Sequence, residues 1–533
     1  MSNASIAATL DEYAALLELS GANPFSARAY RRAAELVRGL PVEAAGLVRG
    51  GRMRELRGIG PGIEARLREL VETGRIEELE ELRRRTAPEL AALGSMLGFG
   101  ARRGSQIATA LGITTADELR TAAAEGRLRD VPGIGPRTEA RILEALARER
   151  SAAVTPLLLH RALALGARLA AELGGILAGD PRRWRDSASR LAVVVATARP
   201  AQVRARFAAL PEIVALLEPD VGITLDGIPI ELVLTTKAEL GTALVRATGS
   251  ADYVASLGPL PEAPDEEGVY AKLGLPFLPP ELRDLPAPLE PPLLVEITEI
   301  RGDLHCHTVW SDGRATVLEM AQAAQAKGYE YLAICDHTAN LRVVPGLTAD
   351  DLRRQGEEIA AANEMLAPFR VLRGTECDIL PDGSLDLPDD VLGELDWVQI
   401  SLHAGQRAPR RELTARVTHA MRHPAARSLS HPTGCLIGHR PENALDLERA
   451  FEVALETGVA LEVNGLPDRL DLSAEHVREA LAAGVAITCS TDAHSVAGLD
   501  WMLLSVHTAR RGGARAVDVL NTRPLVELLS APG

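Results

Sequence analysis

Histidine and aspartate residues follow short apolar runs at several places in the C-terminal half of the sequence. The clearest case is residues 303–307 (Asp-Leu-His-Cys-His), with Ser311-Asp312-Gly313 close behind. Two histidines separated by one residue lie on the same side of an extended strand, so both imidazoles can reach one ion. The chain has only 12 histidines, and half of them lie in motifs of this kind. The pattern therefore indicates a metal site rather than a chance scatter of histidines.

Other apolar runs end in the same types of residue. These runs end at Asp336-His337, Glu376, His403, His431 and Asp492-Ala493-His494. Imidazole and carboxylate ligands without cysteine pairs suit divalent transition metals such as Zn, Mn or Fe. Strands that each end in a ligand and are each followed by a helix are typical of a β/α barrel with its site at one face. We therefore predict a metal-dependent site at one face of a distorted C-terminal β/α barrel.

The composition is that of an ordinary globular chain with several domains. The chain has 533 residues, is 46% hydrophobic and 25% charged, and has a formal net charge of −15. No apolar run approaches the roughly 18–20 residues of a membrane span, and the N-terminus lacks the basic segment of a signal peptide. The five cysteines are odd in number and not spaced as pairs, which favours reduced thiols. We therefore expect a cytoplasmic protein with no membrane partner.

The chain divides by pattern into four regions, so the predicted fold class is multidomain, α and α/β. Residues 1–150 consist of short amphipathic helices broken by Gly-Pro turns, and residues 151–258 alternate helix-like and strand-like segments. Residues 259–296 are rich in proline, which predicts an extended linker without regular structure. Residues 297–533 contain the ligand motifs and form the predicted barrel.

Two turns in the N-terminal region match each other. Residues 56–62 (Leu-Arg-Gly-Ile-Gly-Pro-Gly) and 131–137 (Val-Pro-Gly-Ile-Gly-Pro-Arg) each precede an amphipathic helix, and a weaker copy lies at 97–104. This is the helix-hairpin-helix pattern, in which glycines permit positive φ and bring backbone N–H groups against a phosphate at a helix N-terminus. A plain helix connector is the alternative interpretation. The residues predicted to bind DNA backbone are Gly58, Gly60, Gly62, Gly133, Gly135 and Arg137.

The order and content of these parts resemble the bacterial family X DNA polymerases (PolX type) with a C-terminal PHP (polymerase and histidinol phosphatase) domain. The resemblance covers nearly the whole chain. Residues 23–30 (Asn-Pro-Phe-Ser-Ala-Arg-Ala-Tyr) and the hairpins are similar to the small DNA-binding domain of that family. Residues 303–307, 335–337, 430–433 and 490–494 are similar to its PHP motifs.

The resemblance implies that nine residues bind up to three divalent metal ions, Mn or Zn in the first place, with Fe as a further option. One ion would be held by His305, His307 and Asp492. The second would be held by His403 and His431, with Glu376 bridging the two. The third would be held by Asp312, His337 and His494. Water would then supply the nucleophile that attacks phosphorus near neutral pH.

Five further assignments concern residues in and beside this set. We assign catalytic roles to Asp492, His403 and Arg440. Arg440 is a candidate phosphate clamp, and an exposed loop arginine is the equal alternative. Asp303 and Asp336 adjoin ligands, where they would either orient them or cap turns.

The polymerase part departs from the family pattern. The family holds two metals with an Asp-x-Asp pair on one strand and a third aspartate on a later strand. Here Arg190 and Ala192 stand at the paired positions and Glu231 at the third. The family's lyase lysine is matched by Arg66, whose guanidinium cannot form an imine, and residues 1–150 contain no lysine. We therefore predict a degenerate polymerase core without lyase activity.

The leading hypothesis is a metal-dependent phosphoesterase that acts on DNA backbone at ends, gaps or nicks, such as a 3′→5′ exonuclease in repair. The alternatives are a small-molecule phosphatase of the histidinol-phosphatase type and a repair scaffold that only binds DNA ends. An active polymerase would remain possible only if the aspartate positions were misaligned.

Overall fold

The computed structural model describes most of the chain. The described residues are 3–20, 24–39, 44–56, 58–86, 101–113, 116–135, 138–139, 142, 156–284, 291–340 and 345–530. The chain divides into two compact units, which are described separately below. One unit contains residues 1–157, 165–178 and 189–243, and the other contains residues 158–164, 179–188 and 244–533. The boundaries predicted from the sequence at 150, 258 and 296 stay a prediction.

The N-terminal region is entirely helical where the structure describes it. Its α-helices are α1 (Asn3–Leu19), α2 (Pro24–Gly39), α3 (Ala44–Arg49), α4 (Pro61–Thr73), α5 (Glu77–Thr86), α7 (Ala101–Leu111) and α8 (Ala116–Ala124), with short 3₁₀ turns η1 (Met53–Glu55) and η2 (Arg127–Asp130). Helix α4 shows why: Pro61 opens it, and Ile63, Leu67 and Leu70 bury one face at helical spacing. No helix within the described ranges has the length and apolar character of a membrane span.

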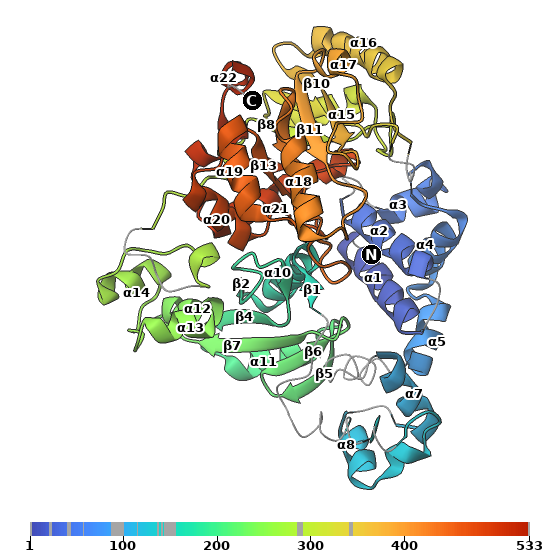
Figure 1. Cartoon of the computed structure of the whole chain (residues 1–533). Coiled ribbons are helices and arrows are strands. Elements are labelled where there is room, and N and C mark those ends of the chain that lie inside the picture. The colour runs from blue at the N-terminus through green and yellow to red at the C-terminus, as the bar shows by residue number, and fades with distance from the viewer. Residues whose placement is uncertain are drawn as a thin grey trace. The chain divides into compact units, whose positions relative to one another are not determined.

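The middle region contains a mixed five-stranded sheet, drawn in green in Figure 1. Its strands lie in the order β2-β4-β7-β6-β5, and β4 pairs in parallel with β7. The strand bounds are β2 (Ile176–Ala178), β4 (Leu191–Ala196), β5 (Ile213–Glu218), β6 (Val221–Thr224) and β7 (Pro229–Thr235). The helices of this region are α10 (Leu159–Leu173), α11 (Pro200–Ala208), α12 (Leu240–Thr248) and α13 (Ala251–Ser256), and β1 (Leu157–Leu158) pairs with β3 (Ser187–Ala188).

The C-terminal region is the predicted β/α barrel, drawn in yellow to red in Figure 1. Seven strands run in chain order from β8 to β14, and every pair in the sheet is parallel. The strands are β8 (Gly302–Cys306), β9 (Tyr331–Ile334), β10 (Arg370–Asp378), β11 (Trp397–Ser401), β12 (Ala426–Leu429), β13 (Ala460–Asn464) and β14 (Ile487–Ser490). A parallel bridge between Cys306 and Ala493 joins the two edges, so the sheet is nearly closed.

A helix follows each strand, because parallel strands need a crossover between them. The helices are α15 (Val317–Ala326), α16 (Ala349–Leu366), α17 (Asp389–Leu392), α18 (Arg410–Ala420), α19 (Leu447–Thr457), α20 (Ala474–Ala483), α21 (Met502–Gly512) and α22 (Leu525–Ser530), with 3₁₀ turns η4 (Ile297–Glu299), η5 (Val496–Trp501), η6 (Ala516–Asp518) and η7 (Leu520–Thr522). Capping boxes at Thr316 and Thr348 fix the starts of α15 and α16. Since all seven strands run the same way, their carboxyl ends meet at one face.

The proline-rich stretch is not the unstructured linker that the sequence predicts. It contains helix α14 (Glu266–Leu273), capped by Asp265 and ended by Gly274 at φ +68°, and the 3₁₀ turn η3 (Pro280–Leu282). The expected absence of regular structure is therefore wrong at these residues, because the prolines flank the helix instead of interrupting it. The local core contains Tyr253, Val269, Tyr270 and Leu278.

A buried ion-pair network stabilises this stretch within its unit. Glu266 accepts hydrogen bonds from Arg182 at 2.6 and 2.8 Å and also from Arg283, whose side chain is fully buried. Arg283 Nε donates to the carbonyl of Leu278 at 2.9 Å. The carboxylate of Glu266 accepts from both guanidinium groups and so satisfies most of their buried N–H donors. Residue Arg182 of the polymerase-like region is thereby used in packing.

Candidate metal centre

All nine residues predicted as ligands come together at the carboxyl ends of the barrel strands. His305 lies within β8 and Glu376 within β10, while the other members follow their strands by one to six residues. Three overlapping groups have ligand atoms within 4.8 Å of one another. The groups are His305-His307-Asp492, His307-Asp312-His337-His494 and His337-Glu376-His403. His431 joins them through Nε2, which lies 2.9 Å from Glu376 Oε1.

The carboxylate of Glu376 lies at the middle of the cluster. Its Oε1 faces His431 and His403, the latter at 3.3 Å. Its Oε2 lies 3.4 Å from His305 Nε2 and 2.9 Å from His337 Nδ1. One carboxylate thus faces imidazoles on both of its oxygens, which is the geometry that a bridging ligand requires.

The remaining carboxylates serve the two ends of the cluster. Asp492 Oδ1 lies 3.1 Å from His307 Nε2, and Asp312 Oδ2 lies 3.2 Å from His494 Nε2. His431 and Asp492 both have positive φ, 26° and 53°. Backbone of this kind costs about 1–3 kcal/mol in a non-glycine residue and persists where the surroundings hold it, as they often do at functional sites.

The electrostatics keep the carboxylates ionised. Burial alone would raise the pKa values of Glu376 and Asp492, but the facing histidines outweigh it and hold both well below the usual range. Burial opposes protonation of His403, yet Glu376 and Asp378 raise its pKa to about 10. In the same way, burial is outweighed at His494, where Asp312 and Asp492 raise the pKa to about 9. A metal ion that binds here must displace these protons.

The donor set fits divalent metal ions. His305 Nε2 and His307 Nε2 lie 3.1 Å apart and face each other. Two imidazole lone pairs at this distance repel unless a proton or a cation lies between or beside them. Burial and the neighbours His494 and His337 lower the pKa of His307 to about 4. At His305, burial is outweighed by Glu462, Asp492 and Glu376, which raise the pKa, so the proton between the two rings belongs to His305 until a metal ion displaces it. Nitrogen and carboxylate donors in overlapping groups are what Zn, Mn or Fe prefer. Their assignment to particular ions stays a prediction.

The sequence analysis missed Glu462 on β13. Its side chain is fully buried, and Oε1 lies 2.7 Å from His305 Nδ1 and 2.9 Å from Gln399 Nε2. Its Oε2 accepts from the backbone N–H of His431 at 2.7 Å. A proton on His305 Nδ1 satisfies Glu462 and leaves the Nε2 lone pair facing the centre, the usual role of a carboxylate behind a histidine ligand.

Two more polar residues behind the predicted ligands were missed. Asp378 Oδ1 lies 2.5 Å from His403 Nδ1, and Asn464 Nδ2 donates to Asp492 Oδ2 at 3.1 Å. A signal existed for the β13 pair, because residues 459–464 (Val-Ala-Leu-Glu-Val-Asn) form an apolar run that ends in polar residues two apart. The sequence analysis also missed Arg469, whose Nε lies 3.7 Å from Asp492 Oδ2.

Asp303 and Asp336 hold the loops that carry ligands. Asp336 accepts from the backbone N–H and the hydroxyl of Thr308, from the hydroxyl of Ser311 and from Gln355. Asp303 accepts from the backbone N–H of His305 and from Thr491. Both therefore bind backbone N–H groups, hydroxyls and, at Asp336, the amide of Gln355, rather than a ligand imidazole.

Arg440 lies outside this group of nine. It follows β12, and its Nε donates to the carbonyl of Gly434 at 2.7 Å. Within the described part of the chain, no ion pair joins it to a predicted ligand. Its assignment as a phosphate clamp, like the catalytic roles of Asp492 and His403, stays a prediction.

The two hairpin turns have the same backbone form. Gly58 and Gly133 have φ of +103° and +83°, and in each turn the next N–H bonds back across it, Ile59 to Leu56 and Ile134 to Val131. Nothing lies within 4 Å of a side-chain carbon built on Gly58, Gly60, Gly62 or Gly135. Packing does not require glycine at these four positions; Gly58, Gly62 and Gly135 are exposed, and Gly60 is half-buried. Arg137, and residues 97–100 of the weaker third copy, lie outside the described residues.

The degenerate polymerase positions lie side by side. Ala192 on β4 is the register partner of Glu231 on β7, and Arg190 forms an ion pair with Glu231. The lyase position, Arg66, pairs with Glu69 at 3.0 Å and with Glu78. Among the described residues, the groups able to hold a metal ion all lie in the barrel.

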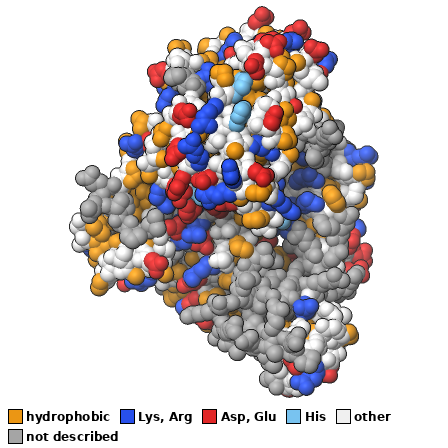
Figure 2. All heavy atoms as spheres, in the orientation of Figure 1, with side chains coloured by type: hydrophobic (Ala, Val, Ile, Leu, Met, Phe, Trp, Pro, Cys, Tyr) orange, Lys and Arg blue, Asp and Glu red, His pale blue; other side chains and the backbone are white. Residues whose placement is uncertain are grey.

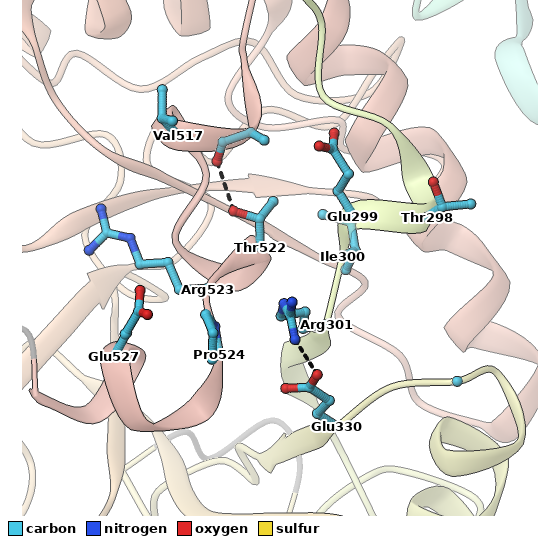
Figure 3. Close-up of a pocket in the computed structure, with 12 residues that line it drawn as sticks. Thr298, Glu299, Ile300, Arg301, Glu330, Val517, Thr522, Arg523, Pro524 and Glu527 are labelled. Carbon is cyan, nitrogen blue, oxygen red and sulfur yellow. Dashed lines mark hydrogen bonds and ion pairs between the residues drawn. The ribbon is translucent and has the colours of Figure 1, made fainter.

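A separate pocket of about 730 Å³ lies away from the metal centre. Arg301 and Glu330, which line it as an ion pair, precede β8 and β9, and Arg523 and Glu527 line another side (Figure 3). It therefore opens at the amino ends of these strands, opposite the predicted ligands. Barrel enzymes place their chemistry at the carboxyl ends, so this pocket has no part in the site.

We predict that Glu462→Gln weakens binding of the metal ion next to His305 by roughly 10- to 100-fold. The amide cannot stabilise the Nδ1 proton as a carboxylate does, so His305 loses its orientation and basicity. Titration of the metal-free protein with Zn²⁺ or Mn²⁺, followed by calorimetry, measures the change. Glu448→Gln, at an exposed position on α19, is the matched control. Equal affinities in the wild type and Glu462→Gln would show that Glu462 only fills the core.

Three protein-family models match parts of the chain. A helix-hairpin-helix domain model matches residues 1–76, and a model of a SAM-like helix-hairpin-helix tandem matches residues 91–148. A PHP domain model matches residues 303–465. The hairpin matches indicate DNA binding, and the PHP domain makes the chain a metal-dependent hydrolase.

Relatives fall into two kinds. A probable phosphatase of Acetivibrio thermocellus is 31% identical over 36% of this chain and 78% of its own length, and a probable phosphatase of Thermoanaerobacter sp. (strain X514) is 28% identical over 41% and 89%. A Bacillus subtilis protein named DNA polymerase/3′-5′ exonuclease PolX is 33% identical over 97% of both chains. With that identity over almost its full length, the chain belongs to the bacterial family X DNA polymerases that carry a C-terminal PHP domain.

Proposed function

We propose that the chain is a metal-dependent phosphoesterase that acts on DNA as a 3′→5′ exonuclease or end-trimming enzyme in repair. The observation that carries the proposal is the convergence of six imidazoles and three carboxylates around Glu376, in a chain that also contains two matched hairpin turns. The name of the Bacillus subtilis relative, which includes 3′-5′ exonuclease, supports the same activity.

Different residues of the centre would bind different metal ions. His305, His307 and Asp492 would hold one ion, His403 and His431 a second with Glu376 between them, and Asp312, His337 and His494 a third. Bound divalent ions, with Mn or Zn fitting the donors best, lower the pKa of water and neutralise charge on phosphate oxygens. Glu462 and Asp378 fix the imidazoles of His305 and His403, so the donors are oriented before a substrate arrives.

The hairpins would bring DNA to the barrel. The backbone at Gly60, Gly62 and Gly135 can approach a phosphate, and the N-terminus of α4 favours its negative charge. On the face drawn in Figure 2, basic and acidic side chains are mixed over the barrel.

A small-molecule phosphatase is the second candidate. It is favoured by the relatives named as probable phosphatases, whose similarity to this chain covers 36–41% of its length. A free phosphomonoester needs the metal centre but no DNA-binding region. The two functions therefore differ in how strongly they depend on the hairpins.

The polymerase core would be inactive. At the positions of the paired aspartates stand Arg190 and Ala192, and the carboxylate of Glu231 is neutralised by Arg190. Two metal ions cannot be held by one carboxylate beside a cation. The neighbouring Arg182 and Arg183 pair with Glu266 and Asp284 rather than standing free for a nucleotide phosphate.

We expect purified protein with Mn²⁺ to shorten labelled single-stranded, nicked or gapped DNA from the 3′ end. His305→Ala and Asp492→Ala should abolish cleavage of DNA and of a generic phosphomonoester alike, because each removes a donor from the shared centre. Gel analysis of 5′-labelled strands measures DNA shortening, and release of a coloured product measures hydrolysis of the phosphomonoester. A preference for the ester by orders of magnitude would favour the phosphatase function instead.

We predict that Gly62→Glu weakens DNA binding by about tenfold and reduces the salt dependence of binding, because a carboxylate at this turn repels phosphate. The site has room for a side chain and lies in the first turn of α4, where a carboxylate stabilises the helix. Ala65→Glu, one turn along the same helix at an exposed position, adds the same charge as a control. Fluorescence anisotropy at several salt concentrations gives both quantities. Equal losses of DNA affinity in the two variants would show that the effect comes from the added charge alone and not from its place in the turn.

We also expect no template-directed nucleotide addition above background on gapped DNA. Glu231→Ala should leave DNA shortening unchanged, since Glu231 lies outside the metal centre. Primer extension with all four nucleotides, in Mg²⁺ and in Mn²⁺, makes the measurement. Efficient gap filling that Glu231→Ala removes would mean that the sheet retains a working polymerase site.

A further inference from the structure

The loop after β13 brings an arginine to the metal centre in a fixed position. Asn464, the last residue of β13, donates to Asp492 Oδ2 at 3.1 Å, and its own Oδ1 accepts from the backbone N–H of Leu466 at 2.9 Å. The backbone N–H of Arg469 then bonds to the carbonyl of Leu466 at 2.8 Å. One amide side chain therefore ties the loop of Arg469 to a predicted metal ligand.

The guanidinium of Arg469 has an unusual environment. The side chain is 17% exposed, and Nε lies 3.7 Å from Asp492 Oδ2, which is too far for a hydrogen bond. Nε and Nη1 are buried and have no hydrogen-bond acceptor among the described residues. A guanidinium stays charged, and leaving a buried charged donor unsatisfied is costly. Such a group calls for an acceptor that the folded chain does not itself provide.

Neutralising Asp492 does not explain this placement. Asp492 already has Asn464 on Oδ2 and His307 on Oδ1 at 3.1 Å each. With both oxygens of Asp492 already bonded, Nε and Nη1 of Arg469 have no acceptor among the described residues, and an anion at the centre would supply one.

We propose that Arg469 binds a non-bridging oxygen of the phosphate that the metal centre hydrolyses. This inference rests on the proposed phosphoesterase function and names the residue that recognises its substrate. Two nitrogens of the planar guanidinium, Nε and Nη1, have unused N–H donors, which match the geometry of a phosphate group. Arg440 is less well placed for this role, since its Nε already donates to Gly434.

The test measures binding of inorganic phosphate to the metal-loaded protein by calorimetry, without any need for DNA cleavage. Arg469→Gln should weaken phosphate binding by about 10- to 100-fold, the loss typical of hydrogen bonds between charged groups. Arg469→Lys should recover only part of it, because an ammonium keeps the charge but lacks the fork. Metal content, measured by atomic spectroscopy, should stay at the wild-type value in both. The matched control is Arg422→Gln. Arg422 is exposed, lies before β12 and pairs with Glu456 on α19.

Several outcomes would overturn the inference. Phosphate binding within twofold of wild type in Arg469→Gln would show that Arg469 does not contact the anion. Loss of metal from Arg469→Gln, restored in Arg469→Lys, would instead assign Arg469 to holding Asp492. The proposed function can fail separately. If the wild-type protein binds phosphate through Arg469 but cleaves only small esters, this inference holds and the proposed nuclease activity is contradicted.

Discussion

The burial of Glu376 among four histidines is the interaction on which the C-terminal domain depends. A carboxylate without exposure to water is unfavourable unless charged or polar groups surround it. Its partners His305, His337, His403 and His431 come from four different strands. They can reach one carboxylate only because the strands are parallel and nearly closed, so their carboxyl ends converge. The same closure places Asp492 beside His307, through the bridge between Cys306 and Ala493.

The buried polar groups around the centre follow from the same constraint. An imidazole that faces the centre through one nitrogen needs a partner for the other, and Glu462 and Asp378 supply it for His305 and His403. Where no partner exists, as at Nδ1 of His307 and of His431, the ring keeps an unsatisfied buried atom. The cost of these atoms and of the positive φ at two ligands has to be met by packing elsewhere in the barrel.

The sequence predicted which nine side chains come together, because each motif places them at or just after the end of a strand. An apolar run that ends in histidine or aspartate specifies both the strand and the end of the strand, so convergence follows from topology alone. Glu462 was missed although residues 459–464 end in polar residues two apart, because it lies inside the apolar run rather than at its end. The prediction of an unstructured linker was wrong at α14, because proline content does not show whether the prolines interrupt a helix or flank it. Asp265 and Gly274, which cap this helix, were the better signal.

In the polymerase-like region, arginines and carboxylates pair with one another. Arg190, which precedes β4, pairs with Glu231, and Arg182 is part of a buried network with Glu266 and Arg283. In the barrel, the carboxylates face imidazoles instead of arginines. Asp312, Glu376 and Asp492 are predicted ligands there, and bound divalent ions would offset their charge, so a phosphate would meet metal ions and Arg469 in a chain whose net charge is −15. Attraction of a phosphate would then come from this local field and not from the charge of the whole protein, because surface charges farther away than about 8–10 Å are screened by salt.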